Sequence, residues 1–180
     1  MRGLVAALML AGTAHADPLG ANDYKAMFVT YADQLVRDAG VARVLELPDG
    51  VTIYETIDGE DRLYAGVDFD PGGPIGCLTA FYAEVMGFVE ACPDLAPTPN
   101  PDHLTRLLAF YAENAYPPAD PSTLRTRFEA LVQQSRDQIT QCAPHAVMID
   151  YAQHLMGDGA DELFDTALAK PRLPVTQPCL

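Results

Sequence analysis

The chain has 180 residues, with 25 acidic and 11 basic side chains and a formal net charge of −14 at pH 7. A strongly acidic surface repels the phosphates of nucleic acids and of anionic lipids, so nucleic acid and membrane surfaces are disfavoured as partners. The same surface favours a protein partner, and a basic one in particular. The length suits one domain with enough chain for a sizeable core.

The first sixteen residues have the features of a cleaved signal peptide. Arg2 supplies the positive start, residues 4–12 form a short apolar run, and residues 14–16 read Ala-His-Ala, a small-x-small cleavage site. Thr13 stands where a lipoprotein needs its modified cysteine, and no later stretch approaches the roughly 18 apolar residues of a membrane helix. We therefore expect a periplasmic or secreted protein without membrane insertion. Cleavage would remove one basic and no acidic residue, so residues 17–180 would carry a net charge of −15.

The N-terminal part of the mature chain predicts a helix followed by a small sheet. Asn22 is a plausible N-cap for a helix over residues 22–39, which Gly40 would end. Residues 41–70 then contain three runs of alternating apolar residues separated by turn signals, which predicts an antiparallel β-meander. Three strands are marginal alone, so helices should cover one face. The third run places its apolar side chains on one face: Leu63, Ala65, Val67 and Phe69.

Residues 74–169 predict a helical bundle around one central helix, Pro74 to Cys92. Its surface is apolar nearly all round, with Thr79, Glu84 and Glu90 as its only polar cover, and such a helix is buried. Asn100-Pro101 and Asp120-Pro121 are start signals for two further helices, and the periodicity indicates two more before residue 170. The segment 170–180 holds three prolines and should form an extended tail. The predicted fold is thus a single α+β domain: an N-terminal helix, a three-stranded antiparallel meander and a disulfide-tied helical bundle.

The four cysteines of an exported chain predict two disulfides. Cys77 and Cys92 would lie about 22 Å apart along one helix, too far to bond. Short joints make successive helices alternate in direction, so the C-terminal ends of helices 75–92 and 122–142 should meet. We therefore predict Cys92–Cys142, which leaves Cys77–Cys179 to hold the tail. A metal or redox role is the alternative, but the chain has no C-x-x-C, and the C-x-x-H of Cys142 lacks a second ligand pair.

The loop from Asp68 to Gly73 is the first candidate ligand or cation site. Asp68 and Asp70 followed by Gly72 and Gly73 open like a calcium loop, but Thr79 stands where the bidentate glutamate belongs. Alternatively, the glycines could present N–H groups to an anion at a helix start, although no lysine follows. The simplest interpretation is a sheet-to-helix turn that uses glycine for its backbone freedom.

A second candidate is an acidic face with one histidine. Asp150, His154 and Asp158 recur at four-residue steps, a pattern that can hold a metal or provide a base. One histidine is few for a metal site, so a solvated acidic helix end is the simpler interpretation. His103 is expected to be a neutral surface histidine in a first helical turn. The sequence carries no cofactor motif, and we assign no catalytic residue, cofactor or metal from it.

Residues 77–142 also carry a family resemblance. The order Cys77, helix, Cys92-Pro93, helix, proline, helix and Cys142 resembles small periplasmic immunity proteins of type VI secretion, which are helical, disulfide-bonded and bind a toxin. The preceding meander has no counterpart in that pattern. The resemblance implies a protein partner in the periplasm.

Two functions follow as expectations. The first is an exported soluble interaction module that binds or inhibits another protein in the periplasm through its acidic surface. The alternative is a small exported hydrolase or metal-dependent enzyme that uses carboxylates and His154. A concave pocket joining His154 to Asp68 or Asp70 would favour the enzyme, and a flat acidic face would favour the binder.

Overall fold

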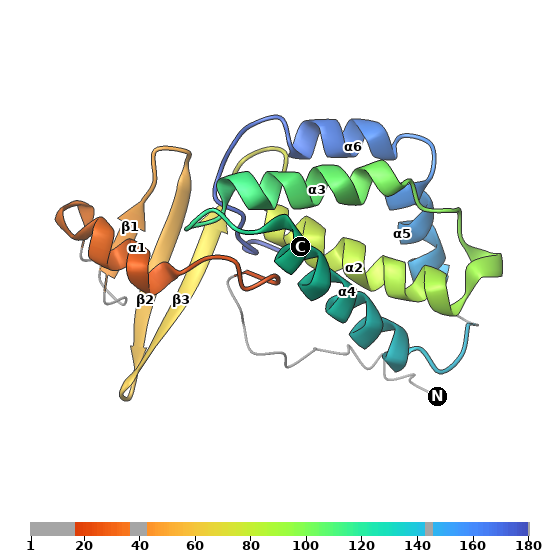
Figure 1. Ribbon diagram of the computed structural model, residues 1–180, viewed down its shortest axis with the longest axis horizontal. Coiled ribbons are helices and arrows are strands. Elements are labelled where there is room, and N and C mark those ends of the chain that lie inside the picture. The colour runs from red at the N-terminus through yellow and green to blue at the C-terminus, as the bar shows by residue number, and fades with distance from the viewer. Residues whose placement is uncertain (1–16, 37–42, 143–145, 180) are drawn as a thin grey trace, which may run out of the picture.

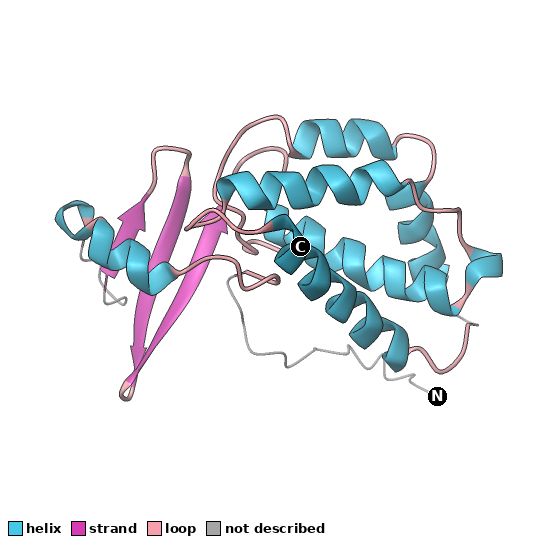
Figure 2. Cartoon of the chain, viewed as in Figure 1, coloured by secondary structure: helices cyan, strands magenta, loops and turns pink. Residues whose placement is uncertain are grey.

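The computed structural model describes residues 17–36, 43–142 and 146–179. It consists of a three-stranded sheet covered by one helix, beside a larger group of helices (Figure 1). Figure 2 shows that all strands lie in one part of the molecule and the long helices in the other. The predicted α+β fold class is confirmed. The predicted signal segment, the helix end at Gly40 and the C-x-x-H histidine lie outside the described residues.

The sheet half follows the predicted meander. Strands β1 (Arg43–Glu46), β2 (Val51–Asp58) and β3 (Asp61–Asp68) pair antiparallel in the order β1-β2-β3. Helix α1 (Tyr24–Thr30) lies against this sheet and is followed by the 3₁₀ turn η1 (Ala32–Gln34). Phe28 from α1, Leu45 from β1 and Ile53 from β2 meet in a buried cluster.

The N-terminal helix is shorter than the predicted 22–39. Asp23, not Asn22, is its N-cap and accepts a hydrogen bond from the Ala26 N–H. The Asn22 side chain makes tertiary contacts instead, donating to the Pro174 carbonyl at 2.8 Å. Beyond η1, Val36 exchanges backbone hydrogen bonds with Val44 of β1, which needs extended backbone. The helix therefore stops because this segment pairs with the sheet edge.

The apolar residues of β3 predicted that their own face would be buried, but the structure buries the opposite face of the strand. Leu63 is 54 % exposed and Phe69 is 76 % exposed, whereas Gly66 and Asp68 are buried opposite Ile53 and Val51. The reason is the C-terminal tail, which lies over this face. A Cβ atom on Gly66 would lie 2.3 Å from Val175 Cγ1, so only glycine leaves room for the tail there.

The helical half is arranged around the predicted central helix. Helix α2 (Ile75–Ala91) is followed by the 3₁₀ turn η2 (Pro93–Leu95), α3 (Pro101–Asn114), α4 (Pro121–Gln138), α5 (Ala146–Met156) and α6 (Ala160–Ala167). Asn100 and Asp120 cap α3 and α4 as predicted. Thr79, expected as polar cover, is buried and donates its hydroxyl hydrogen bond to the Ile75 carbonyl at 2.7 Å. None of the helices in the described segments is long and apolar enough to cross a membrane.

Helices α2 and α4 are in backbone contact at Gly87. A Cβ atom there would lie 2.7 Å from the Arg136 backbone nitrogen and 2.8 Å from the Val132 carbonyl oxygen. The Cys92–Cys142 disulfide, with Cα atoms 5.6 Å apart, joins the end of α2 to the chain beyond α4. These contacts hold the C-terminal halves of the two helices together.

The second disulfide joins Cys77 to Cys179, with Cα atoms 5.4 Å apart, so both predicted pairings are present. The tail is extended as predicted. Gln177 pairs in parallel with Val67 of β3, and the Val175 carbonyl accepts a hydrogen bond from the Gly76 N–H at 2.8 Å. The tail thus lies between sheet and helices. Two disulfides are typical of a protein that folds in an oxidising, exported compartment.

Candidate functional site

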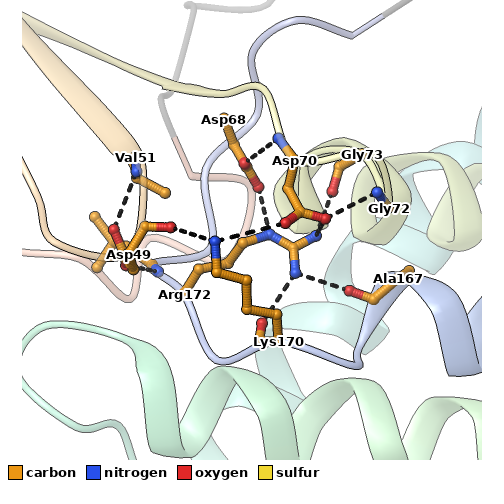
Figure 3. Close-up of polar contacts among 10 residues, drawn as sticks. Asp49, Val51, Asp68, Asp70, Gly72, Gly73, Ala167, Lys170 and Arg172 are labelled. Atoms are coloured by element: carbon orange, nitrogen blue, oxygen red, sulfur yellow. Dashed lines mark hydrogen bonds and ion pairs between the residues drawn. The ribbon is translucent and has the colours of Figure 1, made fainter.

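In the first candidate site, the loop from Asp68 to Gly73 surrounds the positively charged side chain of Arg172 (Figure 3). The Arg172 side chain is fully buried, and its Nε donates to Asp68 Oδ2 at 2.6 Å. Its Nη2 donates to the Gly73 carbonyl at 2.7 Å, and its Nη1 donates to the Ala167 and Lys170 carbonyls, both at 3.0 Å. Every guanidinium nitrogen therefore has an acceptor, and the buried Asp68 carboxylate has a charged partner.

Asp70 completes this cluster from the protein surface. Its Oδ1 accepts from the Gly72 N–H at 2.9 Å and lies 3.8 Å from Arg172 Nη2, while its Oδ2 lies 3.7 Å from Lys170 Nζ. The hydrogen bond from Gly72, assisted by the charges of Arg172 and Lys170, lowers the pKa of Asp70. Both carboxylates of the predicted cation loop are thus neutralised by residues of the tail.

The glycines of this loop also have structural partners. A Cβ on Gly72 would lie 2.9 Å from the Thr166 carbonyl oxygen, so glycine allows the loop to touch α6. The helix-start N–H of Gly76 donates to the tail, and not to a ligand. Asp49 in the β1–β2 turn accepts from the Leu173 N–H at 2.8 Å. The cluster therefore joins the sheet, the start of α2, the end of α6 and the tail.

In the second candidate, Asp150 and His154 lie on the exposed side of α5, and Asp158 lies in the turn that follows this helix. The three side chains line a shallow, open depression of about 440 Å³ together with Tyr151 and Gln153. The structure brings these three residues to one depression, although Asp158 lies beyond the helical face predicted for it, and Asp68 and Asp70 do not line this depression. Within the described segments, no three or more histidine, cysteine or carboxylate side chains are grouped so that they could hold a metal ion.

Sequence reasoning missed a buried carboxylate in the sheet. Glu55 of β2 has a fully buried side chain, with Oε2 2.5 Å from Arg43 Nε and 3.0 Å from Arg62 Nη1. The Tyr64 hydroxyl donates to Oε1 at 3.2 Å. The hydrogen bonds from Arg43 are the main reason that the pKa of Glu55 falls to about 2. Residue 55 continues the alternation of buried Val51 and Ile53 in β2, which is the available signal for an inward position, but only the fold shows which cations reach it.

The lowered pKa of Glu55 predicts acid sensitivity. Because the folded-state pKa lies below the unfolded value, this contribution to stability is present above about pH 4.5 and is lost as the pH falls through about 2. Each pKa unit corresponds to about 1.4 kcal/mol, so we expect the free energy of unfolding to fall by about 3 kcal/mol over this window from Glu55 alone. Urea denaturation at stepwise lower pH measures it. Glu55→Gln should remove this part of the pH dependence, and an unchanged pH profile in that variant would contradict the assignment.

His103 is buried, and the expectation of a surface histidine is wrong. Its Nε2 lies 2.7 Å from Asp161 Oδ1, and its ring stacks on Phe164 with centroids 4.4 Å apart. The first turn of α3 would be exposed in an isolated helix, but α6 covers it here. His103 therefore forms part of the α3–α6 contact.

An apolar groove opens between α2, α4 and α5. Its volume is about 420 Å³, and aromatic and aliphatic side chains form most of its wall: Phe81, Phe88, Leu131, Ile139 and Met148. Neutral polar side chains of α4 stand along it: Gln134, Ser135 and Gln138. Beside the groove, the Phe81 ring meets the Tyr151 ring edge-on at 4.5 Å. Tyr151 is 38 % exposed and Val147 is 64 % exposed, so α5 extends the apolar surface outwards.

Glu84 is the one charged side chain in this groove. Its carboxyl is half-buried, and no hydrogen bond or ion pair joins it to another residue of the described segments. Burial raises the pKa of Glu84. The sequence assigned this residue to the polar cover of the central helix, and only the packing of α4 and α5 beside α2 makes it part of a groove.

Comparison of the chain with protein-family models, curated proteins and solved structures gave no match, so this geometry carries the functional argument alone.

Proposed function

We propose that this protein is an exported interaction module that binds another protein through the groove between α2, α4 and α5. The observation that carries the proposal is that the groove is open and that its Phe81 ring contacts the Tyr151 ring. Exposed Val147 lies one helical turn before Tyr151 in α5. Contiguous exposed apolar surface with a polar rim is typical of protein-binding sites. A small molecule would fill only the groove itself, whereas a protein can also cover the exposed apolar side chains of α5.

The rigidity of the groove supports the same function. Helices α2 and α4, which form two of its walls, are in close contact at Gly87 and are joined beyond their ends by the Cys92–Cys142 disulfide. A groove whose walls are held before binding loses little conformational entropy on binding. The net charge of −15 on residues 17–180 adds long-range attraction for a basic partner.

The alternative of an exported enzyme has less support from the geometry. Catalytic groups act most effectively in clefts that exclude water, because charges interact more strongly there. Asp150, His154 and Asp158 instead line an open depression, and all three side chains are exposed. The acidic side of α5 therefore fits a solvated rim of the binding surface better than an active site.

Site-specific photocrosslinking tests the proposal. Residues 17–180, oxidised and carrying p-benzoylphenylalanine at position 151, would be incubated with periplasmic extract of the producing organism. We expect a discrete crosslinked protein whose yield falls at least about tenfold when Val147→Glu places a charge on the apolar surface. Leu63→Glu is the matched control, because Leu63 is similarly exposed but lies on β3. Equal yields from the two variants would contradict binding through the groove.

A further inference from the structure

We infer that Glu84 makes this groove selective for a lysine or arginine side chain, so that the occupant is a partner segment with one cationic side chain between apolar ones. This inference rests on the proposed function and adds the chemistry of the partner. Glu84 differs from the buried carboxylates elsewhere in the described segments.

The fully buried carboxylates of the described segments are all compensated. Asp68 has Arg172, and Glu55 has Arg43 and Arg62. Asp17 accepts from three backbone N–H groups, those of Leu19, Ala21 and Asn22. A carboxylate that loses water without gaining a donor costs free energy, which explains why these partners are present.

Glu84 departs from this pattern. It lies in the middle of α2, one helical turn from Ala80 and one from Phe88, and all three residues line the groove. The apolar wall removes water from part of its carboxyl, yet no described residue supplies a donor. The nearby Arg136 is directed to Glu90, with Nη1 3.8 Å from Oε2. Because the described segments offer Glu84 no donor, we expect a bound partner to supply one.

The shape and chemistry of the groove favour a cationic side chain as that donor. Lysine and arginine carry a charged tip on a stem of methylene groups, which can lie along Phe81 and Met148 while the tip reaches Glu84. The side-chain oxygens of Gln134 and Gln138 can accept further N–H groups at the rim. A divalent cation fits poorly, because calcium takes six to eight oxygen ligands and the groove holds one carboxylate.

A titration with three probes of equal length tests this chemistry without the partner. n-Pentylammonium reproduces a lysine side chain, 1-pentanol has the same stem without charge, and pentanoate carries the opposite charge. Each would be added to ¹⁵N-labelled, oxidised residues 17–180 while amide shifts are followed by NMR. We expect n-pentylammonium to shift the amides of residues 80–88 and 131–139 and to bind at least about fivefold more tightly than 1-pentanol, with pentanoate weakest.

Variants then assign the preference to one residue. Glu84→Gln should weaken n-pentylammonium binding about tenfold and leave 1-pentanol binding unchanged, because it removes the charge and keeps the shape. Glu129→Gln, an exposed glutamate of α4 that does not line the groove, is the matched control and should change neither. Equal affinities for n-pentylammonium and 1-pentanol in the unmodified protein, or equal effects of the two variants, would overturn the inference.

The two proposals can fail separately. If crosslinking at position 151 depends on Val147 but the groove shows no preference for the ammonium probe, the binding function stands and the role of Glu84 is wrong. If the ammonium preference depends on Glu84 but no groove-dependent crosslink forms, the groove binds cationic amphiphiles and the protein-binding function is wrong. When both hold, Glu84→Gln should also lower the crosslinking yield, whereas Glu129→Gln should not.

Discussion

Replacing Arg172 by methionine should lower the free energy of unfolding by about 3–5 kcal/mol, as expected when one partner of a buried ion pair is removed. Methionine fills a similar volume but donates no hydrogen bond. The Asp68 carboxylate, which is 3 % exposed, would lose its charged partner, and the Gly73 and Ala167 carbonyls would lose their donor. Urea denaturation of the oxidised protein, followed by circular dichroism, measures the loss.

Three further variants separate the buried charge from the loss of a side chain. Arg172→Lys keeps the charge but not the planar set of donors, so its loss should be intermediate. In the double variant Arg172→Met with Asp68→Leu, no unpaired charge remains, and part of the stability should return. Arg106→Met breaks the exposed pair with Asp165 and should cost less than about 1 kcal/mol. A loss in Arg172→Met no larger than in Arg106→Met would contradict the proposed role of Arg172.

Removing the disulfide of the tail with Cys77→Ala and Cys179→Ala should cost about 4 kcal/mol, within a range of about 2–5 kcal/mol. The bond spans 102 residues of sequence, and in the chain-entropy model its loss acts mainly by freeing the unfolded chain. Thermal and urea unfolding of the variant against the oxidised parent measure the difference. A loss below about 1 kcal/mol would show that the unfolded chain gains little freedom.

The same variant tests how the tail is held in the folded state. From the sequence alone, loss of Cys179 would expose the chain from Lys170 onward to protease. In the structure, Arg172 to Val175 are buried. We therefore expect only the residues after Val175 to depend on the disulfide for protection from protease. Trypsin should therefore leave the bond after Arg172 uncut while the variant is folded. The matched control is Cys92→Ala with Cys142→Ala, which leaves the tail disulfide in place, and rapid cleavage after Arg172 only in the Cys77/Cys179 variant would contradict this account.

Features with a local physical cause were predictable from the sequence. Asn100 and Asp120 cap helices because their side chains accept hydrogen bonds from N–H groups two or three residues later. The meander follows from alternating apolar residues between tight turns, and α2 is central because its surface is apolar nearly all round. The disulfide pairing followed from helix length and direction, which need no knowledge of side-chain contacts.

The tertiary structure alone decided the features that depend on distant partners. Asp68 and Arg172 are 104 residues apart, and nothing near either residue shows that the cation of the candidate loop lies in the tail. β3 buries Gly66 in place of its apolar residues because Val175 occupies the space that a side chain would fill. Glu84 lies half-buried in a groove because α4 and α5 pack beside α2. Alternation and helical period describe one element at a time, whereas burial and ion pairing depend on which elements meet.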